Sequence, residues 1–166
     1  MRVGQALGLH HCDFVSRKRE VHIVPRADNA NGARAKVRSA AIVPVSVPLV
    51  RLYSEYMHVE YGDIDSDYVF VNLFAAPRGH AWSYPAVYDL VRRLRVKTGI
   101  EFDPHWFRHS MATRLLRDGT PVEVVSKLLG HSSVTITLAI YGHLTAEDAR
   151  KALAKAGWFT GREVTW

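Results

Sequence analysis

The sequence contains very little cysteine. Cys12 is the single cysteine among 166 residues, so no disulfide can form within the chain and no disulfide framework can support its fold. This composition predicts a protein of the reducing cytoplasm.

Long hydrophobic runs are also missing. The most apolar stretch, AAIVPVSVPLV at residues 40–50, is short and is interrupted by Pro44 and Pro48, whereas a membrane-spanning helix needs about 20 consecutive apolar residues. The first residues, MRVGQALGLHHCDF, lack the apolar core and the small-residue cleavage site of a secretory signal. We therefore expect neither a membrane-spanning segment nor a membrane partner.

Acidic residues are outnumbered by basic ones. The chain has 22 Lys and Arg residues against 16 Asp and Glu residues, which gives a formal net charge of +6. Such an excess indicates an anionic partner, most often a nucleic acid and less often an anionic membrane surface. The length, together with an apolar fraction of 48%, is sufficient for one domain with its own core.

Two candidate strands lie in the first third of the chain. Residues 19–26, REVHIVPR, alternate in the manner of a strand, and residues 40–45, AAIVPV, form a second apolar run. Residues 28–36, DNANGARAK, are rich in Asn, Gly and Ala and predict a loop or hairpin turn between them. Pro44 places the second strand at a sheet edge, or marks the end of that strand.

Helices dominate the rest of the chain. Residues 48–61 and 83–98 carry apolar side chains at helical spacing, and Gly99 lies just beyond the second of these segments. Residues 67–74, DYVFVNLF, predict a short buried strand or an extended segment between the two helices. The fold class expected from this order is α+β and mostly helical, with a small antiparallel sheet near the N-terminus followed by a helical bundle.

The later helices have clear start signals. Asp103 followed by Pro104 is an N-cap with proline at the first helical position. TPVE at residues 120–123 has the form of a capping box, with its threonine as the cap, and the helix it starts should end at Gly130. TAED at residues 145–148 is a related pattern and predicts the start of a last helix.

The helix that begins at Pro104 carries an unusual amount of positive and titratable chemistry. His105, Arg108 and His109 are three or four residues apart, so they share a helix face. A solvated surface is one interpretation, and a metal site built from the two histidines is another, although the H-E-x-x-H pattern lacks its glutamate. A phosphate site fits better, because a helix N-terminus and a planar guanidinium both bind phosphate oxygens.

A second motif lies in LLGHSSVTITLAIYGHL, residues 128–144. His131 follows the glycine that ends a helix, and Ser132 or Ser133 can cap the next helix. Tyr141 comes ten residues after His131, near the end of what the sequence predicts as a short helix. Taken alone, this tyrosine would be interpreted as a packing aromatic.

Taken together, the two motifs resemble the tyrosine recombinase (phage integrase) family. The shared pattern is H-x-x-R at residues 105–108, then L-G-H ending at His131, then Tyr141 followed by Gly-His. The resemblance covers nearly the whole chain, from MRVGQALGL to the helix after YGHLTAEDA. It implies the fold of a tyrosine recombinase catalytic domain.

The resemblance also implies a chemistry, in which Tyr141 attacks a DNA phosphodiester to form a 3′-phosphotyrosyl intermediate and releases a 5′-hydroxyl. The implied catalytic set is Tyr141 as nucleophile, Arg2, Arg108 and His131 as donors to the phosphate oxygens, His105 as acid and base for the tyrosine proton, and Lys36 as acid for the leaving oxygen. Neither ATP nor a metal cofactor is implied, because the covalent link conserves the bond energy and the cationic side chains supply the positive charge.

Some of these positions depart from the family's pattern or have a rival. Gln5 stands three residues after Arg2, where the family usually has an acidic residue. Lys36 lies eight residues before Pro44, in the expected hairpin, whereas its rival Lys18 precedes the first strand. Three further residues beside the motifs, namely His109, Gly142 and His143, are interpreted as structural or supporting.

Double-stranded DNA is the expected partner, with self-association into a tetramer on DNA for a full-length protein of this family. Backbone phosphates would contact basic residues around the proposed hairpin, namely Arg17, Lys18, Arg19, Arg34 and Arg38. For Arg92, Arg93, Arg95 and Lys97 a solvated helix face is at least as good an interpretation.

Two other functions remain open at this point. The segment DGTPVEVVSKLLGHSSVTITLAIY, residues 118–141, has the helix, turn, helix order of a DNA-reading module that needs no catalytic residues. A metal-dependent hydrolase could instead use several of the histidines, namely His105, His109, His131 and His143.

Arg2 is the second residue of the sequence. In the family this arginine is preceded by further catalytic-domain helix and by a separate DNA-clamping domain. We therefore expect residues 1–166 to form a single, incomplete catalytic domain without the clamping domain. With fewer phosphate contacts, it should bind DNA weakly and show little recombination activity.

Overall fold

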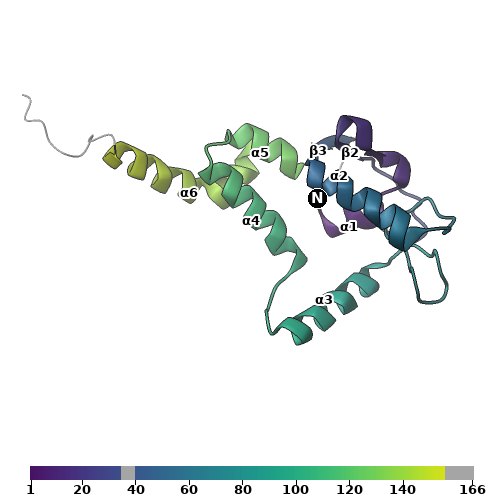
Figure 1. Cartoon of the computed structure of the whole chain (residues 1–166). Helices are drawn as coiled ribbons and strands as arrows, with labels where there is room; N and C mark the ends of the chain where they lie inside the picture. The colour runs from purple at the N-terminus through teal and green to yellow at the C-terminus, as the bar shows by residue number, and fades with distance from the viewer. Residues whose placement is uncertain (35–39, 156–166) are drawn as a thin grey trace, which may run out of the picture. The chain divides into compact units, whose positions relative to one another are not determined.

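The computed structural model describes residues 1–34 and 40–155, which divide into two compact units. The first unit is Met1–Trp106 and the second is Phe107–Trp166. The elements of the first unit (Figure 1) are α1 (Val3–Leu7), β1 (Phe14–Val15), β2 (Glu20–Ile23), β3 (Ala41–Pro44), α2 (Val47–Glu55), a π-helical continuation (Tyr56–Tyr61) and α3 (Tyr84–Thr98). Those that follow are α4 (Pro104–Arg117), which begins in the first unit, α5 (Val122–Leu129) and α6 (Val134–Lys155).

The three strands form one antiparallel sheet in the order β1-β2-β3. In β2, buried Val21 and Ile23 alternate with half-buried Glu20 and His22, as the period of two requires. Both predicted strands are therefore confirmed. Pro44 is the last residue of the edge strand β3, where its missing N–H does not interrupt the ladder.

The core of the first unit lies against this sheet. Leu9, Val21, Ile23 and Val69 are buried together, and Tyr56 packs against them. The Tyr56 hydroxyl donates to the carbonyl of Val69 over 2.8 Å, and burial raises the pKa of this tyrosine to about 12. Of the two interpretations of residues 67–74, the extended segment is right: it pairs only through isolated bridges at Tyr68 and Val71.

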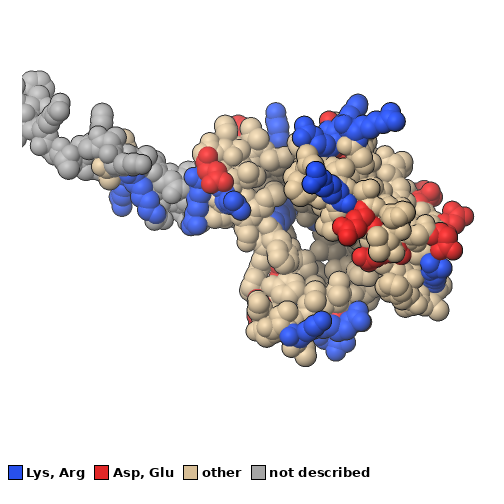
Figure 2. Space-filling view, in the orientation of Figure 1, with Lys and Arg blue, Asp and Glu red and all other residues tan. Residues whose placement is uncertain are grey.

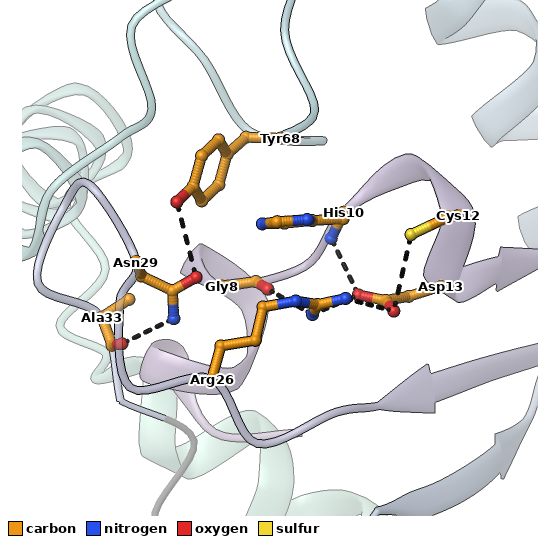
Figure 3. Close-up of polar contacts among 8 residues, drawn as sticks. All are labelled: Gly8, His10, Cys12, Asp13, Arg26, Asn29, Ala33 and Tyr68. Atoms are coloured by element: carbon orange, nitrogen blue, oxygen red, sulfur yellow. Dashed lines mark hydrogen bonds and ion pairs between the residues drawn. The ribbon is translucent and has the colours of Figure 1, made fainter.

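An ion pair between half-buried Arg26 and buried Asp13 connects the turn after α1 to the loop after β2 (Figure 3). Two nitrogens of Arg26 donate to the two carboxylate oxygens of Asp13 over 2.7 and 2.8 Å, and Asp13 is only 4% exposed. Burial alone would raise the pKa of Asp13, but the bonds and charge of Arg26, the backbone N–H of His10 and the nearby charge of His10 together outweigh it, so that pKa is lowered. Arg26 also donates to the carbonyl of Gly8, so the ion pair anchors the end of α1.

Helices α4, α5 and α6 make up the described part of the second unit. Its core consists of Ala112, Leu116, Val125, Leu129 and Tyr141. Within the described residues, no single helix has both the length and the apolar character to cross a bilayer, and only α5 with the first part of α6 meets that test as a bent pair.

The predicted start of α4 and the predicted end of α5 are confirmed. The Asp103 carboxylate accepts from the backbone N–H of His105 over 2.8 Å, with Pro104 as the first helical residue. Gly130 follows α5 with φ of 58°, a left-handed conformation that glycine adopts at little cost.

Two predicted helix starts are wrong. Thr120 does not cap α5, because its N–H bonds to the carbonyl of Leu115 as part of the turn after α4, and α5 begins only at Val122. No helix starts at residues 145–148, because α6 is continuous from Val134 to Lys155. Tyr141 therefore lies inside a long helix and not near the end of a short one. The start of α6 does match the sequence, since the Ser133 hydroxyl accepts from the N–H of Thr135.

Candidate active site

Arg2 lies at the start of α1 and lines a cavity of about 520 Å³ in the first unit. The same cavity is lined by Arg34, Tyr84 and His105, so three of the predicted phosphate-binding or catalytic side chains share one concave surface. Within the described part of the chain, Nη1 of Arg2 is buried without a hydrogen-bond partner. A guanidinium with an unsatisfied nitrogen, on a residue that lines such a cavity, is suited to an anionic oxygen.

Gln5 has a clear structural role beside Arg2. Its side-chain oxygen accepts from the backbone N–H of Arg2 over 2.6 Å, and Gln5 itself is buried. The amide thus holds the first turn of α1, on which Arg2 is carried. An uncharged acceptor is sufficient for this bond, since its donor is a backbone N–H.

The other predicted basic residues fall into three groups. Lys36 and Arg38 lie outside the described residues. Arg17, Lys18 and Arg19 form an exposed basic turn between β1 and β2. On α3, Arg92 pairs with Asp89 over 3.0 Å and Arg95 donates to the carbonyl of Phe102. Figure 2 shows Lys and Arg side chains gathered over this helix at the bottom of the view, and these pairings favour a solvated charged face there.

Arg108 is buried in the second unit. Its side chain is 7% exposed and its guanidinium donates to the carbonyl of Leu129, at the end of α5. The bond holds the guanidinium beside the turn that carries His131. Burial of a guanidinium, a charged group with several hydrogen-bond donors, costs free energy of folding. Buried charged groups of this kind are often found at functional sites.

His131 is fixed at the corner between α5 and α6. Its backbone N–H bonds to the carbonyl of Ser126 over 3.1 Å, and its ring Nδ1 lies 2.9 Å from the hydroxyl of buried Thr137. The contact with Thr137 fixes the orientation of the ring at this corner. The predicted corner position of His131 is confirmed.

Tyr141 is a core residue with its hydroxyl in a polar contact. The residue is 5% exposed and packs with Leu116, Val125 and Leu129, while its hydroxyl oxygen lies 2.5 Å from Nδ1 of His109 on α4. Burial raises the pKa of the phenol, and the nearby positive charge of Arg108 lowers it by less, so the pKa is raised.

The contact made by His109 was not predicted from the sequence. The sequence predicts only a supporting role for His109, whereas in the structure its Nδ1 contacts the Tyr141 hydroxyl. The two lie 32 residues apart, beyond the reach of any spacing rule. The only sequence feature that could have drawn attention to His109 is its position directly after Arg108 in the motif.

The structure thus brings the predicted residues together in two groups. Arg2, Arg34 and His105 line one cavity in the first unit. Arg108, His131 and Tyr141 lie around the α5–α6 corner and its core in the second unit. Each group combines positive charge with a titratable side chain.

Residues 1–148 match the model of the phage integrase family. The chain belongs to this family. Transposase A from transposon Tn554 of Staphylococcus aureus is 40% identical over 156 residues, which are 93% of this chain and 43% of that protein. Tyrosine recombinase XerA of Thermococcus onnurineus is 33% identical over 97% of this chain and 52% of its own length.

Solved structures of family members share the fold. The crystal structure of XerA recombinase matches 93% of this chain and 53% of its own, with a TM-score of 0.68 and 26% identity. The integrase of transposon Tn1549, solved in complex with circular intermediate DNA, matches 94% of this chain and 56% of its own, with a TM-score of 0.70 and 20% identity. The predicted fold is confirmed, and the chain spans about half the length of the relatives it matches.

Proposed function

We propose that this chain is the catalytic part of a site-specific DNA recombinase that cuts and rejoins strands through a 3′-phosphotyrosyl intermediate. The observation that carries the proposal is the environment of Tyr141, whose hydroxyl lies against a histidine and near the buried guanidinium of Arg108. A phenol with a pKa of about 10 is a poor nucleophile at neutral pH, so a basic neighbour and a positive charge are what it requires.

The reaction exchanges one phosphodiester for another. The Tyr141 oxygen forms a bond to phosphorus as the bond to the 5′-oxygen breaks, and the reverse step rejoins the strand. Arg2, Arg108 and His131 would donate to the non-bridging oxygens, where negative charge accumulates. Removal of one such donor typically costs on the order of 3 kcal/mol, or two to three decades in rate.

Duplex DNA is the proposed substrate, and self-association on DNA is proposed with it, because exchange between two sites requires several active subunits. Relatives with the same fold have been solved in complex with transposon DNA, and the net charge of +6 favours a polyanion. A cytoplasmic location is proposed together with this substrate.

The test is covalent capture of DNA. The chain is incubated at high concentration and low salt with a pool of randomised duplexes, each nicked so that the released 5′-hydroxyl fragment diffuses away. We expect adducts that survive denaturation and map to Tyr141, and Tyr141→Phe should bind DNA without forming them. A phosphotyrosyl product from the Phe variant would show that another residue attacks.

Lys36 is proposed to protonate the leaving oxygen. A substrate with sulfur at the 5′-bridging position needs little protonation of its leaving group, so Lys36→Ala should be slow on normal DNA and largely restored on the sulfur substrate. Lys18→Ala is the matched control. Rescue of that variant instead would transfer the role to Lys18.

We also propose that DNA affinity depends on the part of its relatives that this chain does not cover. Fusion of the chain to the part of Tn554 transposase A that it does not match should add phosphate contacts, steepen the salt dependence and raise affinity by about tenfold or more. Equal affinity and equal salt dependence for the chain alone and the fusion would contradict this.

The helix-turn-helix alternative has geometric support but the wrong side chains. Helices α5 and α6 meet at 109° across a short turn, which is within the range of such modules. Residues 134–142 of α6, VTITLAIYG, however, hold no Lys, Arg, Asn or Gln, the side chains that read base edges most often. For the metal-dependent alternative, no three His, Cys, Asp or Glu side chains cluster as metal ligands among the described residues, and the side chain of His143 lies outside them.

A further inference from the structure

Three consecutive basic residues, Arg17, Lys18 and Arg19, form the turn between β1 and β2, here called the basic turn. All three are exposed, and within the described part of the chain none of them forms an ion pair with a carboxylate. The backbone N–H of Val45 donates to the carbonyl of Arg19 over 2.8 Å. Because Val45 directly precedes Ser46, the N-cap of α2, the positive end of that helix lies beside the basic turn. Figure 2 shows Lys and Arg side chains gathered at the top of the view, near the places where Figure 1 labels β2 and α2.

Arg19 holds a backbone conformation that arginine adopts only at a cost. Its φ of 55° and ψ of 52° are left-handed, and among the described residues it is the single non-glycine residue with a positive φ. Glycine adopts this conformation with less strain. A charged side chain kept at a strained position of an exposed turn points to a use for that side chain outside the fold.

The basic turn lies at the opposite end of β2 from the segment that reaches the cavity lined by Arg2. After Ile23, the last residue of β2, the chain continues to Arg26, which donates to the carbonyl of Gly8 at the end of α1, and then to Arg34, which lines the cavity. The strand itself spans about 10 Å, which is about three nucleotide steps along one strand of a duplex. The basic turn is therefore not beside the proposed hairpin, although the sequence suggested that location, because the hairpin follows the other end of β2.

We propose that Arg17, Lys18 and Arg19 form a second DNA-binding surface, which holds backbone phosphates outside the Arg2 cavity. This inference rests on the proposed function, since it takes the substrate to be duplex DNA. Guanidinium groups bind phosphate oxygens with two parallel bonds, and adjacent cations fit the repeated negative charge of a DNA strand. Phosphate contacts carry no base preference, so this surface contributes affinity and salt dependence and does not select a DNA sequence.

Arg19→Gly is the sharpest variant, because its expected effects on stability and on binding have opposite signs. Glycine relieves the backbone strain, so the Tm should be equal to or above that of wild type. Loss of a phosphate contact should lower the slope of log affinity against log salt concentration by about one unit. Binding is measured by fluorescence anisotropy of the whole chain with a labelled duplex of random sequence. An unchanged slope and affinity would overturn the proposal.

A matched pair of triple variants separates this surface from a general effect of net charge. In each variant glutamine replaces three exposed cations, at Arg17, Lys18 and Arg19 of the basic turn or at Arg92, Arg93 and Lys97 of α3. We expect the first variant to lower the salt slope by about two to three units and the second to lower it by less than about one. Equal losses in the two variants would overturn the proposal, because they would reflect net charge alone.

A double variant tests whether the basic turn and the Arg2 cavity hold different phosphates. The losses of slope in Arg2→Gln and Arg19→Gly should add when the two changes are combined, because well-separated sites act independently. A double variant that binds no more weakly than Arg2→Gln would show that both residues hold the same phosphate, and the proposal would be wrong.

Binding and adduct formation are separate measurements, so the two proposals can fail separately. Adducts at Tyr141 together with an unchanged salt slope in Arg19→Gly would overturn the second surface and leave the proposed function intact. The expected loss of slope in Arg19→Gly, together with no adduct from wild type, would refute the proposed function and support the second surface.

Discussion

Gly4 lies two residues after Arg2, where the structure leaves no room for a side chain. A Cβ atom built on Gly4 would be 2.2 Å from the hydroxyl of Tyr84 and 2.5 Å from the backbone carbonyl of Arg34. Both neighbours line the Arg2 cavity. Gly4→Ala is therefore a small change that tests how α1 is packed and how the cavity wall is held.

Two effects of opposite sign compete in this substitution. Replacement of glycine by alanine inside a helix stabilises the folded chain by up to about 1 kcal/mol. The stabilisation is smaller in the first turn of a helix as short as α1. The Tyr84 hydroxyl can swing aside cheaply, but the Arg34 carbonyl is backbone and must move by about 0.9 Å to reach a tolerable 3.4 Å. Overpacking of this kind costs about 1–3 kcal/mol, so we expect a net loss of about 1–2 kcal/mol.

The assay is thermal unfolding, in which a loss of that size lowers the Tm by roughly 3–6 °C for a chain of this length. Gly142→Ala is the matched control, because Gly142 lies inside α6 and a Cβ there meets no atom within 4 Å. It should raise the Tm, since only helix propensity acts. Addition of Tyr84→Phe to Gly4→Ala should restore less than half of the loss, because the carbonyl clash persists. If Gly4→Ala stabilises as much as Gly142→Ala does, the packing argument is wrong.

Three further predictions concern stability. Arg26→Met leaves the buried carboxylate of Asp13 without its ion-pair partner and should lower the free energy of unfolding, measured with urea, by about 3–5 kcal/mol. A second change, Asp13→Asn, should restore a large part of this loss. If Arg26→Met were as stable as wild type, the ion pair would contribute nothing to stability. Because the pKa of Tyr56 is about 12 in the folded chain and near 10 when unfolded, the unfolded state loses a proton first as pH rises, and the free energy of unfolding should fall by about 1–2 kcal/mol across that interval. Tyr56→Phe should reduce the fall of the free energy of unfolding with rising pH, and it should also lose the hydrogen bond to Val69 at neutral pH. If the free energy of unfolding of this variant falls with pH as steeply as that of wild type, Tyr56 is not the source of the pH dependence. Ser133→Ala removes the hydroxyl that caps α6 and should lower the free energy of unfolding by about 1 kcal/mol. Ser133→Gly should lower it by only a few tenths, because glycine is itself a tolerated N-cap residue. An unchanged Tm in Ser133→Ala would show that the hydroxyl bond contributes nothing.

The sequence by itself determined those features that depend on near neighbours. Alternation predicted β2, and Asp103 with Pro104 marked the start of α4, because a cap is a bond between residues two or three apart. The motif around His105, Arg108, His131 and Tyr141 identified the family, since its spacing is readable without coordinates. Local patterns also produced the errors: TPVE and TAED have the form of helix starts, but the turn after α4 uses Thr120 and nothing interrupts α6 at residues 145–148.

Only the tertiary structure decided which side chains meet. The contact between His109 and Tyr141 joins residues 32 apart, and the Asp13–Arg26 pair joins two loops 13 residues apart. Neither follows from spacing, because each depends on how helices and loops pack once apolar surface is buried. The same packing buries Tyr141, raises its pKa and places an imidazole at its hydroxyl. The motif thus predicted Tyr141 as a nucleophile, and the helix packing determined which histidine contacts its hydroxyl.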